Sequence, residues 1–225
     1  MKHESFNESA EMYLKTACEL AVGDAPVAIS ALAGRLGVSA VSATEMVHRL
    51  QQDGLIDHRP YKGITLTEDG RHQAANVIRS HRLWECFLAQ QLRLPWDEVH
   101  ELACRLEHAT DAQVTDALEV YLDYPLTCPH GSPIPTSDGI IVEPADQPLT
   151  TLRPGQSAVI SRVHPETSEL LSYLRDLGLL PGTRITLREL APFQGPLVLL
   201  VRQDIRYLGE ECAAQIFVSQ IEESL

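Results

Sequence analysis

The sequence predicts a mainly α-helical protein with a small β part. We expect an N-terminal winged helix-turn-helix, a helical middle domain and a C-terminal small β-barrel. Three observations lead to this fold class. Two short helical stretches joined by a Gly-containing turn precede two strand patterns within residues 29–67. Residues 68–123 show helical patterns interrupted near Pro95, and residues 152–222 hold short strand patterns at the spacing of a small barrel.

The composition favours a globular protein of the cytoplasm. Of the 225 residues, 44% are hydrophobic, which is enough for packed cores. There is no apolar run near the length of a membrane span, and the first residues do not start a signal peptide. The five cysteines include no CxxC pair, and their number is odd. We therefore expect free thiols in a reducing compartment.

The first 70 residues predict a winged helix-turn-helix. After a helix over 6–22, a helix over 29–36 leads through Gly37-Val38-Ser39 to a second helix over 40–53. In this turn, Gly suits the helix C-terminus and Ser caps the next helix. The strand patterns of residues 55–59 and 63–67, on either side of Pro60-Tyr61-Lys62, form the wing.

In such a domain the second helix enters the DNA major groove, with its first residues facing base edges. Candidate DNA contacts at the helix start are Ser39, Val41, Ser42, Thr44 and Glu45. Arg49, Arg59 and Lys62 are candidate phosphate contacts. The net charge of −13 argues against nucleic acid at first, and winged helices also serve as protein-interaction modules. However, the acidity is concentrated in residues 76–145, with 4 Lys and Arg against 11 Asp and Glu.

The helix predicted over residues 98–108 carries an unusual face. At positions i, i+4, i+7 and i+8 it presents His100, Cys104, Glu107 and His108, where a buried helix would show Leu, Val or Ile. Imidazole, thiol and carboxylate are ligands of divalent transition metals. Taken singly, each residue is an ordinary surface or core residue, but the shared face favours a metal site.

The preceding helix, over 68–92, adds His81 and Glu85 at i, i+4. Thr110-Asp111 caps a third helix, which runs to about Asp123, and homodimerisation would bury the remaining apolar faces of this helical domain, 71–140. Within the Pro-rich stretch 124–150, Cys128 and His130 are interpreted as parts of a packed connector rather than ligands. The expected linker is 141–151 and the C-terminal domain is 152–225.

These residues resemble the diphtheria toxin repressor family of metal-dependent transcriptional repressors over essentially the full length. The resemblance is carried by Ala10–Thr16, by His81-Arg82-Leu83, by Val99–His108 and by the stretch His130-Gly131-Ser132-Pro133-Ile134-Pro135. Leu177-Gly178-Leu179-Leu180-Pro181-Gly182 resembles the SH3-like, FeoA-type domain of the longer members.

The resemblance implies a homodimer that binds double-stranded operator DNA, two metal ions per subunit, and no enzymatic activity. It assigns a regulatory metal site to Met12, Cys104, Glu107 and His108. It assigns an ancillary site to His81, Glu85 and His100, with Glu166 or Glu169 as a further ligand from the C-terminal domain.

The thioether of Met12 and the thiol of Cys104 are soft donors, which favour Fe²⁺ over Mn²⁺ as the metal that is sensed. Mn²⁺ stays an alternative. Glu45 and Val41 depart from the family's recognition helix, where Gln and Pro are expected, so the operator sequence stays open. The competing hypotheses are that the protein is a metalloenzyme or a metal-storage protein. The enzyme is disfavoured because the four regulatory ligands form a closed set with no separate acid–base group beside it.

Overall fold

The computed structural model describes residues 8–21, 23, 25–193 and 195–223. These fall into two compact units, of which the first lies within Met1–His81, Leu106–Ala117 and Pro135–Ile141. The second comprises Arg82–Arg105, Leu118–Ile134 and the described part of Val142–Leu225. Each unit is described separately. Among the described residues, no helix is both long and apolar enough to cross a membrane.

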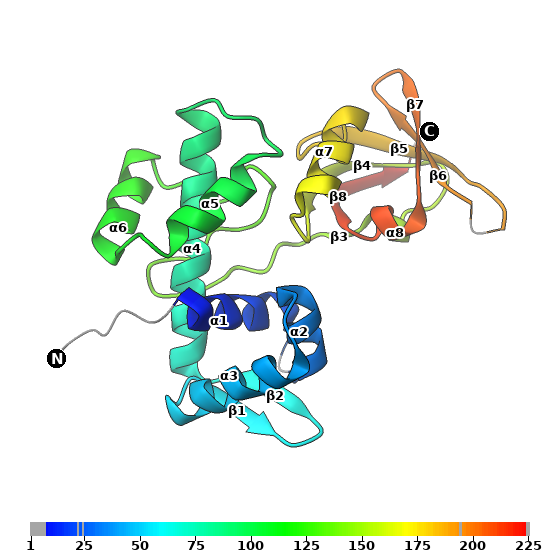
Figure 1. Ribbon diagram of the computed structural model, residues 1–225. Coiled ribbons are helices and arrows are strands. Elements are labelled where there is room, and N and C mark those ends of the chain that lie inside the picture. The colour runs from blue at the N-terminus through cyan, green and yellow to red at the C-terminus, as the bar shows by residue number, and fades with distance from the viewer. Residues whose placement is uncertain (1–7, 22, 24, 194, 224–225) are drawn as a thin grey trace. The chain divides into compact units, whose positions relative to one another are not determined.

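The first unit begins with three helices and a β-hairpin (Figure 1). The helices are α1 (Glu8–Leu20), α2 (Ile29–Leu36) and α3 (Ala40–Gln52), and the hairpin strands are β1 (Ile56–Arg59) and β2 (Gly63–Leu66). The three helices and the two strands of the wing occur along the chain in the predicted order. Residues 6, 7 and 22 of the first predicted helix lie outside the described residues.

Apolar side chains from all three helices and both strands form one core in this unit. Leu14 of α1, Leu32 of α2 and Val47 of α3 are completely buried in it, and Ile56 and Ile64 add the hairpin. Because burial of each large aliphatic side chain stabilises by about 1.5–3 kcal/mol, this core fixes α1 against the helix-turn-helix.

Three helices contribute residues to both units. They are α4 (Glu68–Gln90), α5 (Val99–Glu107) and α6 (Ala112–Tyr121). All three agree with the predicted helices to within two residues at either end. In the second unit, Leu83 and Cys86 of α4 pack with Leu118 and Leu122, and with Cys128 of the following loop.

The C-terminal part of the second unit is a six-stranded antiparallel sheet with two helices and a 3₁₀ turn (Figure 1). Its elements are β3 (Gln147–Pro148), η1 (Leu149–Thr151), β4 (Gln156–Val163), α7 (Ser168–Leu177), β5 (Arg184–Leu190), β6 (Leu197–Val201), β7 (Asp204–Leu208), α8 (Glu210–Ala213) and β8 (Ile216–Glu223). The strand order is β3-β8-β4-β5-β6-β7. Buried Leu171 and Leu174 of α7 belong to the core of this sheet.

The small barrel predicted for this region is an open sheet in the structure. In the described residues β3 and β7 are the two edges of the sheet and do not pair with each other, so the sheet stays open. The physical reason lies in the edge strands. β3 is only two residues long and pairs with β8 alone, and β7 pairs only with β6.

Candidate metal centre

In the first unit, buried ionisable groups gather around the carboxylate of Glu107 at the end of α5. Lys15 Nζ lies 2.7 Å from Glu107 Oε2 and 3.0 Å from Oε1. His81 Nδ1 lies 2.5 Å from Oε2, and His108 Nε2 lies 3.2 Å from Oε1. The other ring nitrogen of His108 lies 2.6 Å from Glu11 Oε2. The cluster therefore combines two candidate imidazole ligands with a carboxylate and an ammonium.

These contacts decide the charges in the cluster. Burial alone would raise the pKa of Glu107. Its contacts with His108, His81 and Lys15 lower the pKa by more than burial raises it, so the carboxylate stays ionised. The contact with Glu107 raises the pKa of His108, burial lowers it, and Glu11 raises it again. In the metal-free protein His108 is thus held towards its protonated form.

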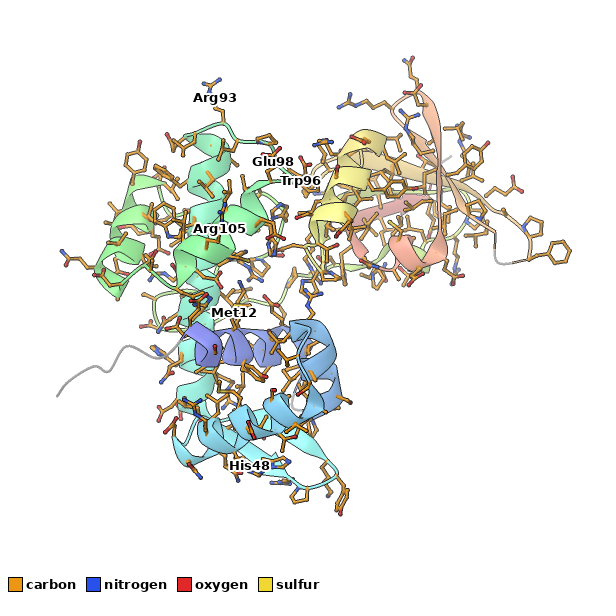
Figure 2. All side chains as sticks on the ribbon, viewed as in Figure 1. Met12, His48, Arg93, Trp96, Glu98 and Arg105 are labelled. Atoms are coloured by element: carbon orange, nitrogen blue, oxygen red, sulfur yellow. The ribbon has the colours of Figure 1, made fainter. Side chains whose placement is uncertain are left out.

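Met12 belongs to the same helix as Glu11 and Lys15, which contact His108 and Glu107. Figure 2 shows Met12 on α1, and its side chain is half-buried. Glu11 and Lys15 are one helical turn apart, so together they hold this side of α1 against residues 107–108.

The second unit holds another cluster, built around Glu85 of α4. Glu85, His100 and Glu166 each offer one ligand atom, and these atoms all lie within 4.8 Å of one another. His100 Nδ1 lies 3.2 Å from Glu85 Oε1 and 3.4 Å from Glu166 Oε2. Cys104 Sγ lies 3.7 Å from His100 Nε2. Glu166 is thus brought to the cluster, whereas Glu169 is exposed and makes none of these contacts.

Cys128 and His130 join this cluster, although sequence reasoning interpreted them as a packed connector. Glu85, Cys128 and His130 offer three ligand atoms within 4.8 Å of one another, and all three residues are buried. His130 Nδ1 lies 3.1 Å from Glu85 Oε1. In the sequence, only the Cys-x-His spacing hints that these two residues could bind a metal. The hint becomes meaningful because the fold places this loop beside Glu85.

The loop that carries Cys128 and His130 is fixed on both sides. His130 Nε2 donates to the carbonyl oxygen of Trp96 at 2.9 Å, so its Nδ1 faces Glu85. Gly131 has φ +88°, and a Cβ there would lie 1.9 Å from the carbonyl oxygen of Ser161, so only Gly fits. Ser132 Oγ donates to Glu166 Oε1 at 2.7 Å and orients that carboxylate.

Electrostatics keep His100 and Glu166 of the second cluster charged and paired with each other, and keep the thiol of Cys128 neutral. Burial lowers the pKa of His100, but contacts with the Cys104 thiol and two carboxylates raise it to about 12. Burial and Glu85 raise the pKa of Glu166, but the neighbouring imidazoles and Arg82 lower it to about 2. Burial raises the pKa of the Cys128 thiol, and both nearby carboxylates raise it further.

The donors present fit a divalent transition metal. Carboxylate oxygen, imidazole nitrogen and thiol sulfur meet in a buried space, and these are the donor types of zinc and iron sites. Within the described residues, His130 Nδ1 is buried without a hydrogen bond of acceptable geometry, despite its approach to Glu85. A cation shared between that nitrogen and the carboxylate would satisfy both groups.

The residues predicted to contact DNA gather on α3 and the wing of the first unit. Ser39 caps α3 by accepting a hydrogen bond from Ser42 N at 3.0 Å. Val41 is 69% exposed, and Tyr61 at the wing tip is fully exposed. The other predicted contacts that are exposed are Ser42, Glu45, Arg49, Arg59 and Lys62, whereas Thr44 is half-buried and donates to the carbonyl oxygen of Ala40. His48, labelled in Figure 2, is also exposed on α3.

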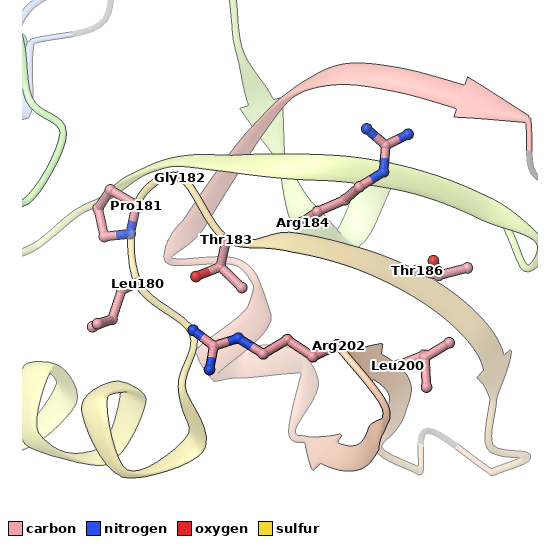
Figure 3. Close-up of a pocket in the computed structure, with 8 residues that line it drawn as sticks. All are labelled: Leu180, Pro181, Gly182, Thr183, Arg184, Thr186, Leu200 and Arg202. Carbon is pink, nitrogen blue, oxygen red and sulfur yellow. The ribbon is translucent and has the colours of Figure 1, made fainter.

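A separate groove of about 550 Å³ lies on the C-terminal sheet. Arg184, Thr186 and Arg202 line it together with the Leu180–Thr183 turn, and Figure 3 shows Arg202 reaching towards Leu180 and Thr183. None of the predicted site residues lines this groove.

Comparison with known proteins identifies all three regions of the chain. Residues 5–64 match the family described as "Iron dependent repressor, N-terminal DNA binding domain". Residues 67–136 match "Iron dependent repressor, metal binding and dimerisation domain", and residues 147–220 match the FeoA domain.

Similar proteins carry the names of metal-dependent repressors. The iron-dependent repressor IdeR of Mycobacterium bovis is 32% identical over 226 residues, covering 95% of this chain and 98% of that protein. The diphtheria toxin repressor of Corynebacterium jeikeium is 35% identical over 134 residues, covering 60% of this chain and 56% of that protein.

Two solved structures share the fold. A manganese-dependent transcriptional repressor in complex with manganese has a TM-score of 0.84 and 33% identity, covering 96% of this chain and 100% of its own. ScaR with bound Cd²⁺ has a TM-score of 0.83 and 31% identity, covering 93% of this chain and 98% of the ScaR chain. An iron-dependent repressor thus matches this chain along almost the entire length of both proteins. This chain therefore belongs to the diphtheria toxin repressor family of iron- or manganese-dependent transcriptional repressors, which are DNA-binding regulators and not enzymes.

Proposed function

We propose that this protein senses Fe²⁺, with Mn²⁺ as the alternative, and represses metal-homeostasis genes by binding palindromic operators as a metal-loaded homodimer. The observation that carries the proposal is the gathering of buried metal-ligand side chains around two carboxylates, Glu107 in the first unit and Glu85 in the second. Buried ionisable groups are costly unless they are paired or bind a metal, so such clusters mark functional sites.

We assign two metal ions to each subunit. The family resemblance gives the regulatory site Met12, Cys104, Glu107 and His108. The ancillary site takes His81, Glu85, His100 and Glu166, and we add Cys128 and His130 to its candidate ligands because they lie with Glu85. Bound metal would supply divalent positive charge to carboxylates that now rely on imidazoles and an ammonium.

The donor set supports iron as the sensed metal. Met12 and Cys104 provide a thioether and a thiol, and the buried thiol of Cys128 adds a third sulfur. Sulfur donors suit Fe²⁺ better than Mn²⁺, which prefers oxygen. Because affinity rises along the first-row series towards copper, Co²⁺, Ni²⁺ and Zn²⁺ are expected to bind in vitro as well.

The packing of α1 supplies a route from metal to DNA contact within the first unit. Met12, Glu11 and Lys15 are on α1, and Leu14 of the same helix packs in one core with Val47 of α3. A ligand on α1 therefore acts on the helix that presents the recognition residues. By linkage, operator DNA would tighten metal binding by the same factor as metal tightens DNA binding.

Homodimerisation is supported by exposed apolar side chains of the second unit. Tyr121, Tyr124 and Leu126 are 63%, 60% and 84% exposed, a concentration that marks an interaction surface. Two-fold symmetry would match a palindromic operator with two recognition helices. We keep the domain division of residues 1–70, 71–140 and 152–225, with a linker over 141–151, as part of the proposal.

Substitution of the regulatory ligands tests the proposal. Cys104→Ala or His108→Ala should abolish Fe²⁺-stimulated DNA binding, measured by fluorescence anisotropy, while circular dichroism and sedimentation still report a folded dimer. Glu169→Gln, at an exposed carboxylate outside the clusters, is the matched control. Unchanged metal-dependent DNA binding in both ligand variants would refute the regulatory site. Stoichiometric metal binding with no effect on DNA would point to a storage protein.

A further inference from the structure

Lys15 is a lysine of α1 that is only 5% exposed, and its ammonium contacts both oxygens of a carboxylate that is buried too. The two distances to Glu107 are 2.7 and 3.0 Å. A buried ammonium is costly to remove from water, and it persists only when an opposite charge compensates it. Lys15 and Glu107 are 92 residues apart in the chain, so the pair is a product of the fold.

The same carboxylate is a proposed ligand of the regulatory metal. A carboxylate binds a metal through the oxygen lone pairs that accept hydrogen bonds in its absence. Both oxygens of Glu107 already accept from Lys15, and His81 and His108 approach them as well. A divalent cation must therefore compete with the ammonium for Glu107, and it must also bear the repulsion of a positive charge close by.

We propose that Lys15 is the resident counter-ion of Glu107 in the metal-free protein, and that it lowers the affinity of the regulatory site for metal. The inference rests on the proposed function, because it takes Glu107 as a metal ligand. The ammonium stabilises the metal-free state and leaves the ligand carboxylate ionised and oriented. Metal binds only at concentrations high enough to displace the ammonium from Glu107.

A point charge opposes every divalent cation alike. Lys15 should therefore set the affinity of the site but not its order of preference among metals, which follows from the donor atoms. This separates Lys15 from the sulfur ligands, whose substitution should change the preference.

The test is titration of the full-length, metal-free protein with Co²⁺ and, separately, with Mn²⁺. Binding is measured by calorimetry and, for Co²⁺, also by its absorption bands. Lys15→Gln should bind both ions roughly 10- to 100-fold more tightly, since a hydrogen bond to a charged group no longer has to be broken. The same variant should unfold at a lower temperature without metal, because Glu107 loses a positive partner. Arg35→Gln, which removes an exposed positive charge on α2, should behave as wild type.

A second variant keeps the test informative if Lys15→Gln does not fold. Lys15→Arg retains the charge, and its guanidinium pairs with carboxylates through two hydrogen bonds, so metal affinity should equal that of wild type or be weaker. Tighter binding by Lys15→Arg, or unchanged or weaker binding by folded Lys15→Gln, would overturn the proposal. Glu107→Gln separates the two claims. If the Glu107→Gln variant binds metal as tightly as wild type does, the proposed regulatory site itself fails.

Discussion

At the scale of single residues, two of the proposed ligands, His130 and Glu166, are oriented by a neighbour that is not itself a ligand. Trp96 accepts a hydrogen bond from His130 through its backbone, and Ser132 donates one to Glu166. Such partners fix which atom of the ligand faces the metal, and they usually matter for affinity nearly as much as the ligand itself. Metal affinity should therefore depend on the 129–132 loop as well as on α4 and α5.

The ligand-bearing helix could be predicted from sequence because its signal is local. His100, Cys104 and Glu107 share a face at helical spacing, and that pattern needs no tertiary structure. Contacts between distant segments left no such signal. Lys15 with Glu107 and Glu85 with His130 depend on how the chain folds back, so the sequence could not reveal either contact.

The Glu166 carboxylate makes the metal-free protein sensitive to acid. Its pKa falls from an ordinary 4.5 to about 2 in the folded protein, so its contribution to stability is complete above pH 4.5 and is lost as the pH falls towards 2. Glu166→Gln should flatten the decline of the unfolding temperature over this pH range, measured by differential scanning calorimetry without metal. The exposed Glu169→Gln variant should keep the wild-type slope, and equal slopes in all three proteins would contradict the assignment.

At the scale of elements, helices and strands with strong periodicity were predicted to within a few residues, and short ones were not. The stretch 141–151, which we expect to be a linker, contains the short elements β3 and η1, and α8 was not predicted. Elements of two to four residues carry too little pattern to be read. The open sheet could not be foreseen either, because closure depends on which edge strands meet and not on the pattern of any one strand.

The cap of α3 allows helix stability and DNA contact to be separated. Ser39 accepts from the backbone N–H of Ser42, so Ser39→Ala should destabilise the protein by about 1 kcal/mol, measured by urea denaturation. Ser39→Asp should restore the cap but weaken metal-dependent DNA binding, because a carboxylate at the start of the recognition helix is repelled by phosphates. DNA binding by Ser39→Asp as tight as that of wild type would remove Ser39 from the predicted interface.

At the scale of the whole molecule, the acidic charge and the proposed DNA partner are reconciled by metal and by dimerisation. The formal charge of −13 includes 11 acidic residues against 4 basic ones in residues 76–145, the stretch that holds most proposed ligands. Bound divalent cations would reduce this local repulsion. DNA contact is left to a small exposed set on α3 and the wing, so affinity for an operator requires two such sets in one dimer.

The exposed apolar residues of the second unit give the dimer a direct test. Leu126→Asp should convert the protein to a monomer in sedimentation velocity at micromolar concentration, because a buried charge at an interface is costly. Ile205→Asp, at an exposed apolar residue of the edge strand β7, is the control and should leave the dimer intact. A Leu126→Asp dimer would show that the interface lies elsewhere.

The most direct measurement of the central claim is retention of DNA from a genomic-fragment pool by the wild-type protein, under anaerobic conditions, with and without Fe²⁺ or Mn²⁺. We predict selective retention of a palindromic sequence only when metal is present, with Fe²⁺ effective at lower concentration than Mn²⁺. Absence of retention with either metal, in protein that binds metal stoichiometrically, would contradict the account.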